Sequence, residues 1–368
     1  MEEHTVANRG RAKRKSAQSA QDALLARTLQ QEIWNGLRGK KPKCEELGID
    51  LKAEKKRGAS SGGGAASTDD CTTLSGRKVN LRKSEAEKQE GGAKMLKHCV
   101  GKNSLGFLEA DARRGCSRTG SVCDVCVQQL AHEITKGSGI VVIRGAISKE
   151  AAAKARKAIN KLTLAEEKRG TSLEGELGPS HRRIFNLLNE GPPFTNLITH
   201  TLIFNVLSRV IGSDFTLGSF SANEIGAKCP QGPAHVDYPY SMLESFPSDP
   251  LACQAIFCLD EWTQARGATR VKLHSQKQKE HPDKDDELET VVEGQPGDLV
   301  MYNSLLHHRS GPNSTQTSRI GLLVQFLAKY VRPMEDQVRG VKAHVKKGAD
   351  KRLRQLLALD CPFSTAGT

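Results

Sequence analysis

The stretch PGDLVMYNSLLHHRSGPNSTQTSRIGLLVQF, residues 296–326, holds most of the pattern that decides the fold. It begins with a Pro-Gly-Asp turn, runs through an apolar segment and presents two histidines. It then turns at SGPN and opens a second apolar segment at Arg319. Short apolar runs bounded by Gly, Pro and Asn are typical of β-strands. We therefore expect two strands here, with both histidines between them.

The same pattern of short apolar runs bounded by turn residues begins after Asp214 and continues through the C-terminal half of the chain. Further short strands are predicted at FTLGSFSANEIGA (215–227), AHVDYPY (234–240), LACQAIFCLDEW (251–262) and ETVVEG (289–294). Clusters of Gly, Pro and Asp separate them. Many short strands with such turn signals indicate an antiparallel sandwich or barrel.

Helices are predicted mainly before this region. DVCVQQLAHEITKGSG (124–139) has apolar residues at helical spacing and ends in glycine, and the β-branched run GIVVIRGAI (139–147) follows as a buried strand. A helix capped by Ser148 comes next. Another is expected over residues 193–211, and DKRLRQLLAL (350–359) predicts a basic amphipathic helix packed on the outside.

The charge of the chain is concentrated at its two ends. The net charge is +13, and residues 1–120 carry 25 Lys or Arg against 15 Asp or Glu, whereas residues 121–332 carry 23 of each. With its Gly/Ser-rich and mixed-charge segments, the range 1–120 is predicted to be a basic, disordered tail. A contact with nucleic acid, if one exists, is expected from this tail and not from the neutral region.

Ten cysteines are scattered along the chain, and no secretory signal or membrane-spanning run is visible. Reduced thiols in an intracellular compartment fit best, so we expect a cytoplasmic protein, with the nucleus as the alternative. Cys123 and Cys126 form one CxxC pair, and no second pair completes a zinc site. Ordinary helix cysteines are the simpler interpretation.

A second polar pair lies upstream, in GPAHVDYPYS, residues 232–241. His235 and Asp237 stand two positions apart, so on a strand their side chains leave the same face and converge on one ion. Two histidines and one carboxylate on an all-β scaffold form the facial triad of non-haem Fe(II) oxygenases, which leaves three positions on the ion open. Arg319 supplies the planar cation that grips a dicarboxylate cosubstrate, and Ser310 a hydroxyl donor beside it.

At these residues the chain resembles the phytanoyl-CoA dioxygenase family. The matching stretches are SHRRIFNLLNEGPPF (180–194), HVDYPY (235–240), GATRV (267–271), GDLVMYNSLLHHRSGPN (297–313), SRIGLLVQF (318–326) and LRQLLALDCPF (353–363). The resemblance implies a mainly β fold with flanking helices, a double-stranded β-helix or jelly roll, over residues 121–364 with the C-terminal helix included. It also implies Fe(II), 2-oxoglutarate and O2 as cofactor and cosubstrates, with ascorbate as a possible addition.

The resemblance also selects the third metal ligand. In the family the ligating histidine precedes the cosubstrate arginine by eleven positions, which His308 satisfies and His307 does not. The expected metal ligands are therefore His235, Asp237 and His308, with His307 on the other side of the strand. An intact Asp237 argues for hydroxylation, because related halogenases carry a small residue there. The implied reaction releases succinate and CO2 and hydroxylates a small organic substrate that the sequence does not identify.

Other residues leave alternatives open. Tyr238 and Tyr240 either line the substrate pocket or pack the core, and Arg182 and Arg183 either meet an anionic substrate or carry solvated helix charge. The loop 272–277 departs from the family pattern. Two rival functions also remain: a non-catalytic metal-binding or regulatory protein on the same scaffold, and an oxygenase tethered to nucleic acid by its basic tail. The sequence does not predict the oligomeric state.

Overall fold

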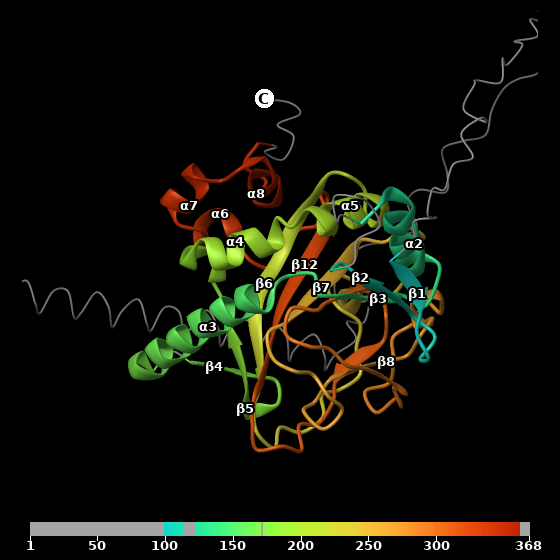
Figure 1. The fold of residues 1–368 in the computed structure, drawn as a ribbon, viewed down its shortest axis with the longest axis horizontal. Helices are drawn as coiled ribbons and strands as arrows, with labels where there is room; N and C mark the ends of the chain where they lie inside the picture. The colour runs from blue at the N-terminus through green and yellow to red at the C-terminus, as the bar shows by residue number, and fades with distance from the viewer. Residues whose placement is uncertain (1–98, 114–121, 171, 361–368) are drawn as a thin grey trace, which may run out of the picture. The chain divides into compact units, whose positions relative to one another are not determined.

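The computed structural model describes residues 99–113, 122–170 and 172–360, all within one compact unit of the chain. Within these ranges, two β-sheets form the centre of the fold (Figure 1). The larger sheet has the spatial order β1 (Val100–Lys102), β2 (Leu108–Asp111), β3 (Ile140–Arg144), β10 (Leu299–Asn303), β7 (Ala252–Cys258), β12 (Arg319–Ala328), β6 (Phe215–Ile225), β5 (Gly178–Ile184) and β4 (Leu173–Gly175). The smaller sheet has the order β11 (His308–Ser310), β8 (Thr269–Val271) and β9 (Thr290–Val292).

Neighbouring strands pair antiparallel, except for β2 and β3, which run parallel. The smaller sheet faces the inner side of the larger one, and an apolar layer that includes Val142, Ile256, Val271 and Val300 fills the space between them. This two-sheet arrangement is the predicted jelly roll. The fold class expected from the sequence is thereby confirmed for the described residues.

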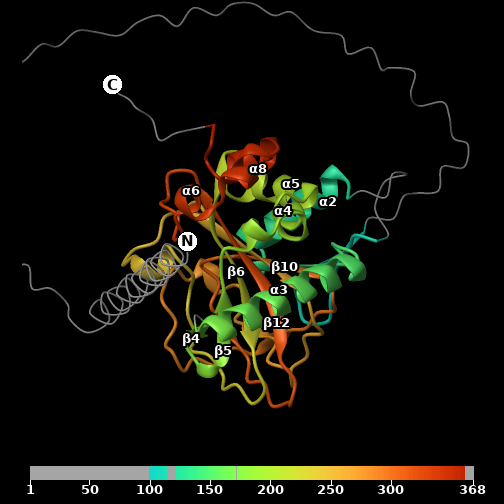
Figure 2. The same ribbon diagram turned by 90° about the vertical axis from the view of Figure 1, so that its left-hand side faces the viewer.

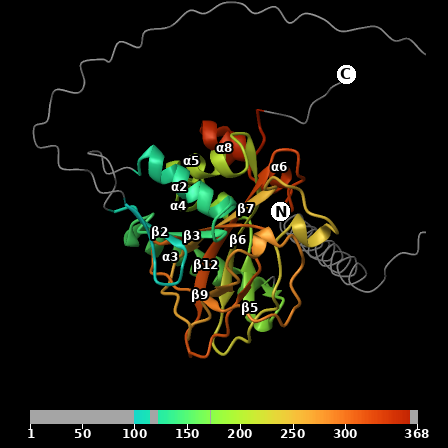
Figure 3. The same cartoon turned by 90° about the vertical axis from the view of Figure 1, so that its right-hand side faces the viewer.

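Helices cover the outer face of the larger sheet. They are α2 (Asp124–Thr135), α3 (Lys149–Arg169), α4 (Pro192–Ile198), α5 (Thr201–Val210), α6 (Gln337–Gly340), α7 (Ala343–Lys347) and α8 (Lys351–Leu356). Figure 2 shows α3 lying across the sheet in front of β12, and in Figure 3 helices α2, α4, α5 and α8 gather on one side of it. Every second residue of the central strands, such as Phe215 and Phe257, packs against these helices in one continuous apolar core.

The helix predictions are mostly confirmed. The Ser148 hydroxyl caps α3 by accepting a hydrogen bond from the Ala151 amide. The single helix expected over residues 193–211 is wrong, because two helices, α4 and α5, occupy this range. His200 interrupts them: its backbone is extended, and its side chain accepts a hydrogen bond from the Leu202 amide to begin α5.

The boundary of the predicted tail also needs correction. Strands β1 and β2 lie inside the range 1–120 and extend the larger sheet at the edge of β3. The rest of the predicted tail, residues 1–98 and 114–120, lies outside the described residues, as do residues 361–364 of the predicted domain. Among the described residues, no helix is both long and apolar enough to cross a membrane.

Candidate metal centre and active site

Backbone hydrogen bonds bring the two polar segments of the sequence together. His235 and His308 form an antiparallel bridge, in which each amide donates to the other's carbonyl over 3.0 and 3.1 Å. The Asp237 amide donates to the Ser304 carbonyl over 2.9 Å. The predicted strand over residues 234–240 is wrong, since this bridge is its single sheet-like contact. The bridge nevertheless positions both halves of the site.

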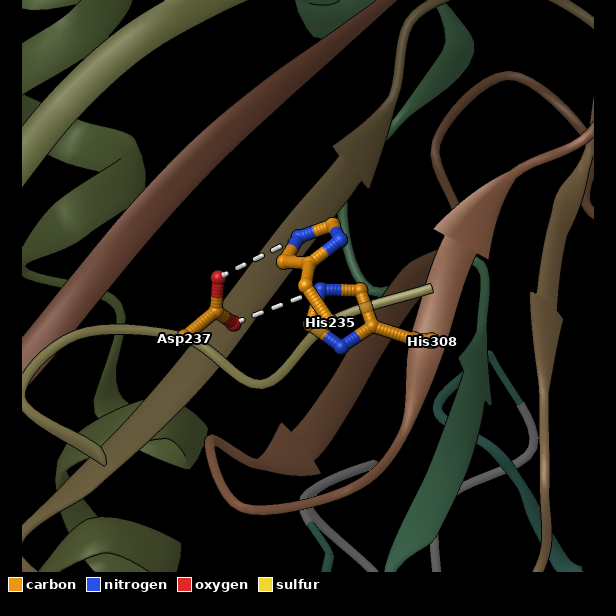
Figure 4. Close-up of side chains that lie close together, drawn as sticks. All are labelled: His235, Asp237 and His308. Carbon is orange, nitrogen blue, oxygen red and sulfur yellow. Dashed lines mark ion pairs between the residues drawn. The ribbon is translucent and has the colours of Figure 1, made fainter. Parts of the chain in front are cut away.

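The side chains of His235, Asp237 and His308 converge at this point (Figure 4). His308 Nε2 lies 3.5 Å from Asp237 Oδ2, and His235 Nε2 lies 4.0 Å from Asp237 Oδ1. One donor atom from each residue falls within 4.8 Å of the others. Ligands about 2.0–2.2 Å from a common ion stand roughly 3 Å apart, so small side-chain adjustments suffice for all three to share one.

Each histidine presents one particular nitrogen to this point. His235 Nδ1 lies 3.0 Å from the Pro233 carbonyl and His308 Nδ1 lies 2.8 Å from the Leu306 carbonyl. A carbonyl only accepts, so Nδ1 carries the hydrogen in both rings and Nε2 keeps its lone pair for an ion. The donors are therefore oriented in advance.

The electrostatics of the cluster also suit a cation. Burial lowers the pKa of His308 to about 4, so its imidazole is neutral at physiological pH and able to ligate. Asp237 Oδ2 is buried and accepts no hydrogen bond, although an unpartnered buried carboxylate oxygen is costly. A divalent ion removes that cost, and the N,N,O donor set is one that transition metals prefer.

The neighbouring histidine and the CxxC pair lie outside this cluster. His307 points away, and its Nε2 lies 2.9 Å from the Glu280 carbonyl, as expected for the opposite side of the chain. Cys126 is buried in α2, three positions after Cys123, which precedes the first residue of that helix. In the described part of the chain, the cluster of His235, Asp237 and His308 is the one group of three or more His, Cys, Asp or Glu side chains with metal-ligand spacing.

Arg319 is a buried cation at the start of β12. Its side chain is 1% exposed, its guanidinium stacks 4.0 Å from the Trp262 ring, and Nη2 donates to the Gly267 carbonyl. Nε has no hydrogen-bond partner. Burial lowers the pKa of Arg319 to about 10, which still leaves it charged at neutral pH. A buried guanidinium with unused donors fits an anionic ligand.

Ser310 follows His308 by two positions on β11, so the two side chains leave the same face of the strand. Space beside its hydroxyl depends on Gly232, because a Cβ there would come within 2.7 Å of Ser310 Oγ. Gly267, the acceptor for Arg319, packs against Gly311 in the same way. Ser310 and Arg319 therefore lie at the same end of the two-sheet interior.

The two tyrosines after Asp237 have different surroundings. The Tyr238 hydroxyl donates to the Arg332 carbonyl over 2.7 Å. Tyr240 is buried, its hydroxyl accepts a hydrogen bond from the Leu251 amide, and burial raises its pKa to about 12. It packs with Val236 and Leu327 in a small apolar cluster. Tyr240 therefore packs in a core cluster, and the prediction that these two tyrosines line a substrate pocket stays a prediction.

Two further residues lie near the cluster: Tyr302, which was not singled out from the sequence, and Arg183, for which an anionic substrate and helix charge were both left open. The Tyr302 hydroxyl lies 3.3 Å from His308 Nε2, and burial together with the Asp237 carboxylate raises its pKa well above the usual value. Arg183 faces the same interior, where burial lowers its pKa and the charge of Asp237 acts against that shift. Period-two alternation in GPSHRRI would have placed Arg182 and Arg183 on opposite faces, had this segment been interpreted as a strand.

Arg182 and Arg183 show this alternation. Both lie on β5 and not on a helix, so the expected helix charge is wrong. Arg182 turns outward to the carboxylates of Glu167 and Glu224. Arg183 turns inward, where its nearest hydrogen-bond partner is the Ser221 hydroxyl at 3.3 Å.

Comparison with known proteins now identifies the family. A model of the phytanoyl-CoA dioxygenase family matches residues 136–321, half of the chain. The chain belongs to the phytanoyl-CoA dioxygenase family. The predicted resemblance is thus confirmed, and the protein is an oxidoreductase of the dioxygenase type.

Individual relatives are distant. Dioxygenase af480 of Aspergillus fumigatus is 25% identical over 231 residues, which cover 61% of this chain and 74% of the relative. Dioxygenase olcK of Penicillium canescens is 24% identical over 220 residues, covering 56% and 72%. Among solved structures, the epimerase SnoN in complex with Fe3+, alpha ketoglutarate and nogalamycin RO is 19% identical, with a TM-score of 0.46, and the match covers 62% of this chain and 93% of that one.

Proposed function

We propose that this phytanoyl-CoA dioxygenase family member is an Fe(II)- and 2-oxoglutarate-dependent hydroxylase. It oxidises a small organic substrate and releases succinate and CO2. The observation that carries the proposal is the convergence of His235, Asp237 and His308, with two Nε2 lone pairs and one unpartnered carboxylate oxygen directed at the same point.

These three residues hold the metal. Ferrous iron with a chelating keto acid is the group that activates dioxygen in such enzymes, and three protein donors leave three positions on an octahedral ion open for it. The work of the chain is to fix the donors, bind the anions and shield the site from water. The backbone bridge between His235 and His308 performs the first of these tasks.

Arg319 binds the distal carboxylate of 2-oxoglutarate. Its guanidinium is held flat by the Trp262 ring, so the planar fork faces one direction, and bidentate pairing with a carboxylate requires such a fixed plane. The Ser310 hydroxyl donates to the same group. The charge on Arg319 persists at neutral pH, because its lowered pKa of about 10 is still well above 7.

Arg183 supplies a second positive charge inside the site. Two cosubstrate carboxylates and Asp237 together bring three negative charges, whereas a ferrous ion and Arg319 bring three positive ones. Arg183 adds a further cation whose charge interacts with that of Asp237, and it leaves the interior favourable to an anionic ligand. Because the interior between the two sheets carries these cations, we expect the substrate to be a small molecule that binds there.

Neither rival function is favoured by an observation on the described residues. All three donors are present, and a non-catalytic scaffold has no need of a buried Arg319 whose Nε has no hydrogen-bond partner. The basic tail of the nucleic-acid hypothesis lies almost wholly outside the described residues, so this hypothesis stays a prediction.

The test is a matched pair of histidine variants in the full chain. Anaerobic addition of Fe(II) and 2-oxoglutarate should produce a visible metal-to-ligand charge-transfer band, and addition of air with ascorbate and a substrate panel should produce succinate. His308→Ala should lose both signals, because it removes an iron ligand. His307→Ala should keep both, because the ring nitrogen of His307 bonds to a backbone carbonyl outside the ion-binding cluster. A band that survives His308→Ala and disappears in His307→Ala would overturn the ligand assignment.

A further inference from the structure

Tyr302 lies beside the metal-binding atoms but has no place in the three-ligand scheme. It stands on the inner face of β10, opposite Gln254 of β7, and is 2% exposed. Its ring packs against His308 with centroids 4.9 Å apart, and its hydroxyl lies 3.3 Å from His308 Nε2. That separation resembles the 3.5 Å between His308 Nε2 and Asp237 Oδ2. The phenol is therefore directed at the ion-binding point itself.

The hydrogen-bond acceptors around Tyr302 decide what its hydroxyl does. His308 Nδ1 already donates to the Leu306 carbonyl, so Nε2 accepts the Tyr302 hydrogen while no ion is present. An ion takes the Nε2 lone pair and ends that bond. The acceptor left nearby is the Asp237 carboxylate, whose charge acts on the Tyr302 hydroxyl. One carboxylate oxygen binds the ion, so the other can accept the hydrogen bond that Tyr302 no longer makes to His308.

We propose that Tyr302 is a positioning residue for the metal centre, whose hydroxyl donates to the Asp237 oxygen that does not bind the ion. This inference rests on the proposed function. The hydrogen bond holds Asp237 in monodentate ligation and so keeps a further position on the ion free for small molecules. Partners that orient metal ligands in this way commonly change metal affinity by about 10- to 100-fold when they are removed.

Direct ligation by Tyr302 is the competing arrangement, because its hydroxyl stands as close to His308 Nε2 as Asp237 does. A phenolate there would place a second anion beside Asp237 in a buried site, which is unfavourable. A fourth protein donor would also leave too few open positions for a chelating keto acid and oxygen. The hydrogen-bond donor is therefore the assignment that agrees with the site.

The experiment measures Co(II) binding to the metal-free full chain without 2-oxoglutarate, by calorimetry and by the visible Co(II) spectrum. Tyr302→Phe keeps the ring contact with His308 and removes only the hydroxyl. We expect its Co(II) dissociation constant to rise about 10- to 100-fold. We also expect weaker visible bands, since the second Asp237 oxygen then joins the ion and raises its coordination number.

Tyr240→Phe is the matched control. It removes an equally buried hydroxyl, one that contacts the Leu251 amide and not the metal ligands. Its Co(II) affinity should stay within about threefold of wild type, a change too small to report a lost ligand-orienting bond. Thermal unfolding of both metal-free variants shows whether the change in affinity comes from general instability. A comparable loss of affinity in both variants would overturn the proposal.

Two further outcomes separate failure of this inference from failure of the proposed function. If Asp237→Ala binds Co(II) as tightly as wild type, the metal site itself is wrong. If Asp237→Ala loses Co(II) while Tyr302→Phe binds normally, only the role of Tyr302 is wrong. A phenolate-to-Fe(III) charge-transfer band that disappears in Tyr302→Phe would identify Tyr302 as a ligand and would also overturn the proposal.

Discussion

The two faces of the larger sheet are built from the same strands, and both carry apolar residues, but buried polar side chains gather on the inner face. On the outer face, residues such as Phe215 and Phe257 pack against helices in a continuous apolar core. On the inner face, the alternate positions include Gln254, Gln325 and Arg319, each of which keeps a buried polar atom without a hydrogen-bond partner. Buried polar groups are normally satisfied. The outer face therefore contributes mainly to stability, whereas the polar positions of the inner face are available to bind ligands.

The largest expected effect follows from removing the inner carboxylate. Asp237→Ala should lower succinate formation by at least about 1,000-fold, since it deletes a metal ligand; this corresponds to roughly 4 kcal/mol or more in activation free energy. The free energy of unfolding of the metal-free protein should change by less than about 1 kcal/mol, because the lost oxygen was unpartnered. Turnover assays and urea denaturation measure the two quantities. A strongly destabilised variant would show that Asp237 maintains the fold.

A substitution on the outer face should have the opposite effect, lowering stability while leaving cosubstrate binding normal. Phe215→Ala removes a ring that contacts Phe204 and Phe326, so the free energy of unfolding should fall by about 3–5 kcal/mol. At a temperature where the variant remains folded, its Michaelis constant for 2-oxoglutarate should stay normal. Calorimetry and initial rates give both values. A changed Michaelis constant in the folded variant would mean that the two faces are not separable.

Two arginines extend the comparison to cosubstrate binding. Arg319→Lys keeps the charge and loses the planar fork, so 2-oxoglutarate binding should weaken by about 1.5–3 kcal/mol, roughly 10- to 100-fold. The rate at saturating 2-oxoglutarate should change less than the affinity. Arg182→Lys, on the outward side of β5, should leave the affinity unaltered. Equal affinities in the two variants would remove Arg319 from the cosubstrate site.

A smaller effect is expected on the pH dependence of stability. Burial lowers the pKa of inner-face His181, so the folded protein keeps this ring neutral, whereas the unfolded chain takes up a proton at about pH 6.5. Stability contributed in this way is present above pH 6.5 and is lost as the pH falls below it. Denaturation of the metal-free protein at pH 7 and pH 5 should show this loss, with a shallower decline in His181→Gln. Parallel declines in both proteins would exclude His181 as a contributor.

The sequence was most informative where apolar residues dominate. Strands β6, β7, β10 and β12 were predicted because their apolar runs are bounded by turn residues. Strand β5 was missed, because its side chains are polar on both faces: Arg182 pairs outward and Arg183 points inward. Strands β1 and β2 were missed for a related reason, since these short, mostly polar segments become strands through pairing with β3.

In the site, too, some residues could be predicted from nearby sequence, whereas others are placed by contacts between distant segments. Spacing alone brought His235 and Asp237 together, and family resemblance selected His308 over His307. The role of Tyr302 and the core position of Tyr240 depend on pairings between strands far apart in the sequence. No local pattern distinguishes these two tyrosines, although one faces the metal ligands and the other an apolar cluster.

The most direct test is an anomalous-diffraction map at the iron edge, from crystals of the full chain grown anaerobically with Fe(II) and 2-oxoglutarate. We expect one peak at about 2.0–2.2 Å from His235 Nε2, His308 Nε2 and an oxygen of Asp237. A peak bound by His307, or no peak within ligand distance of Asp237, would contradict this expectation.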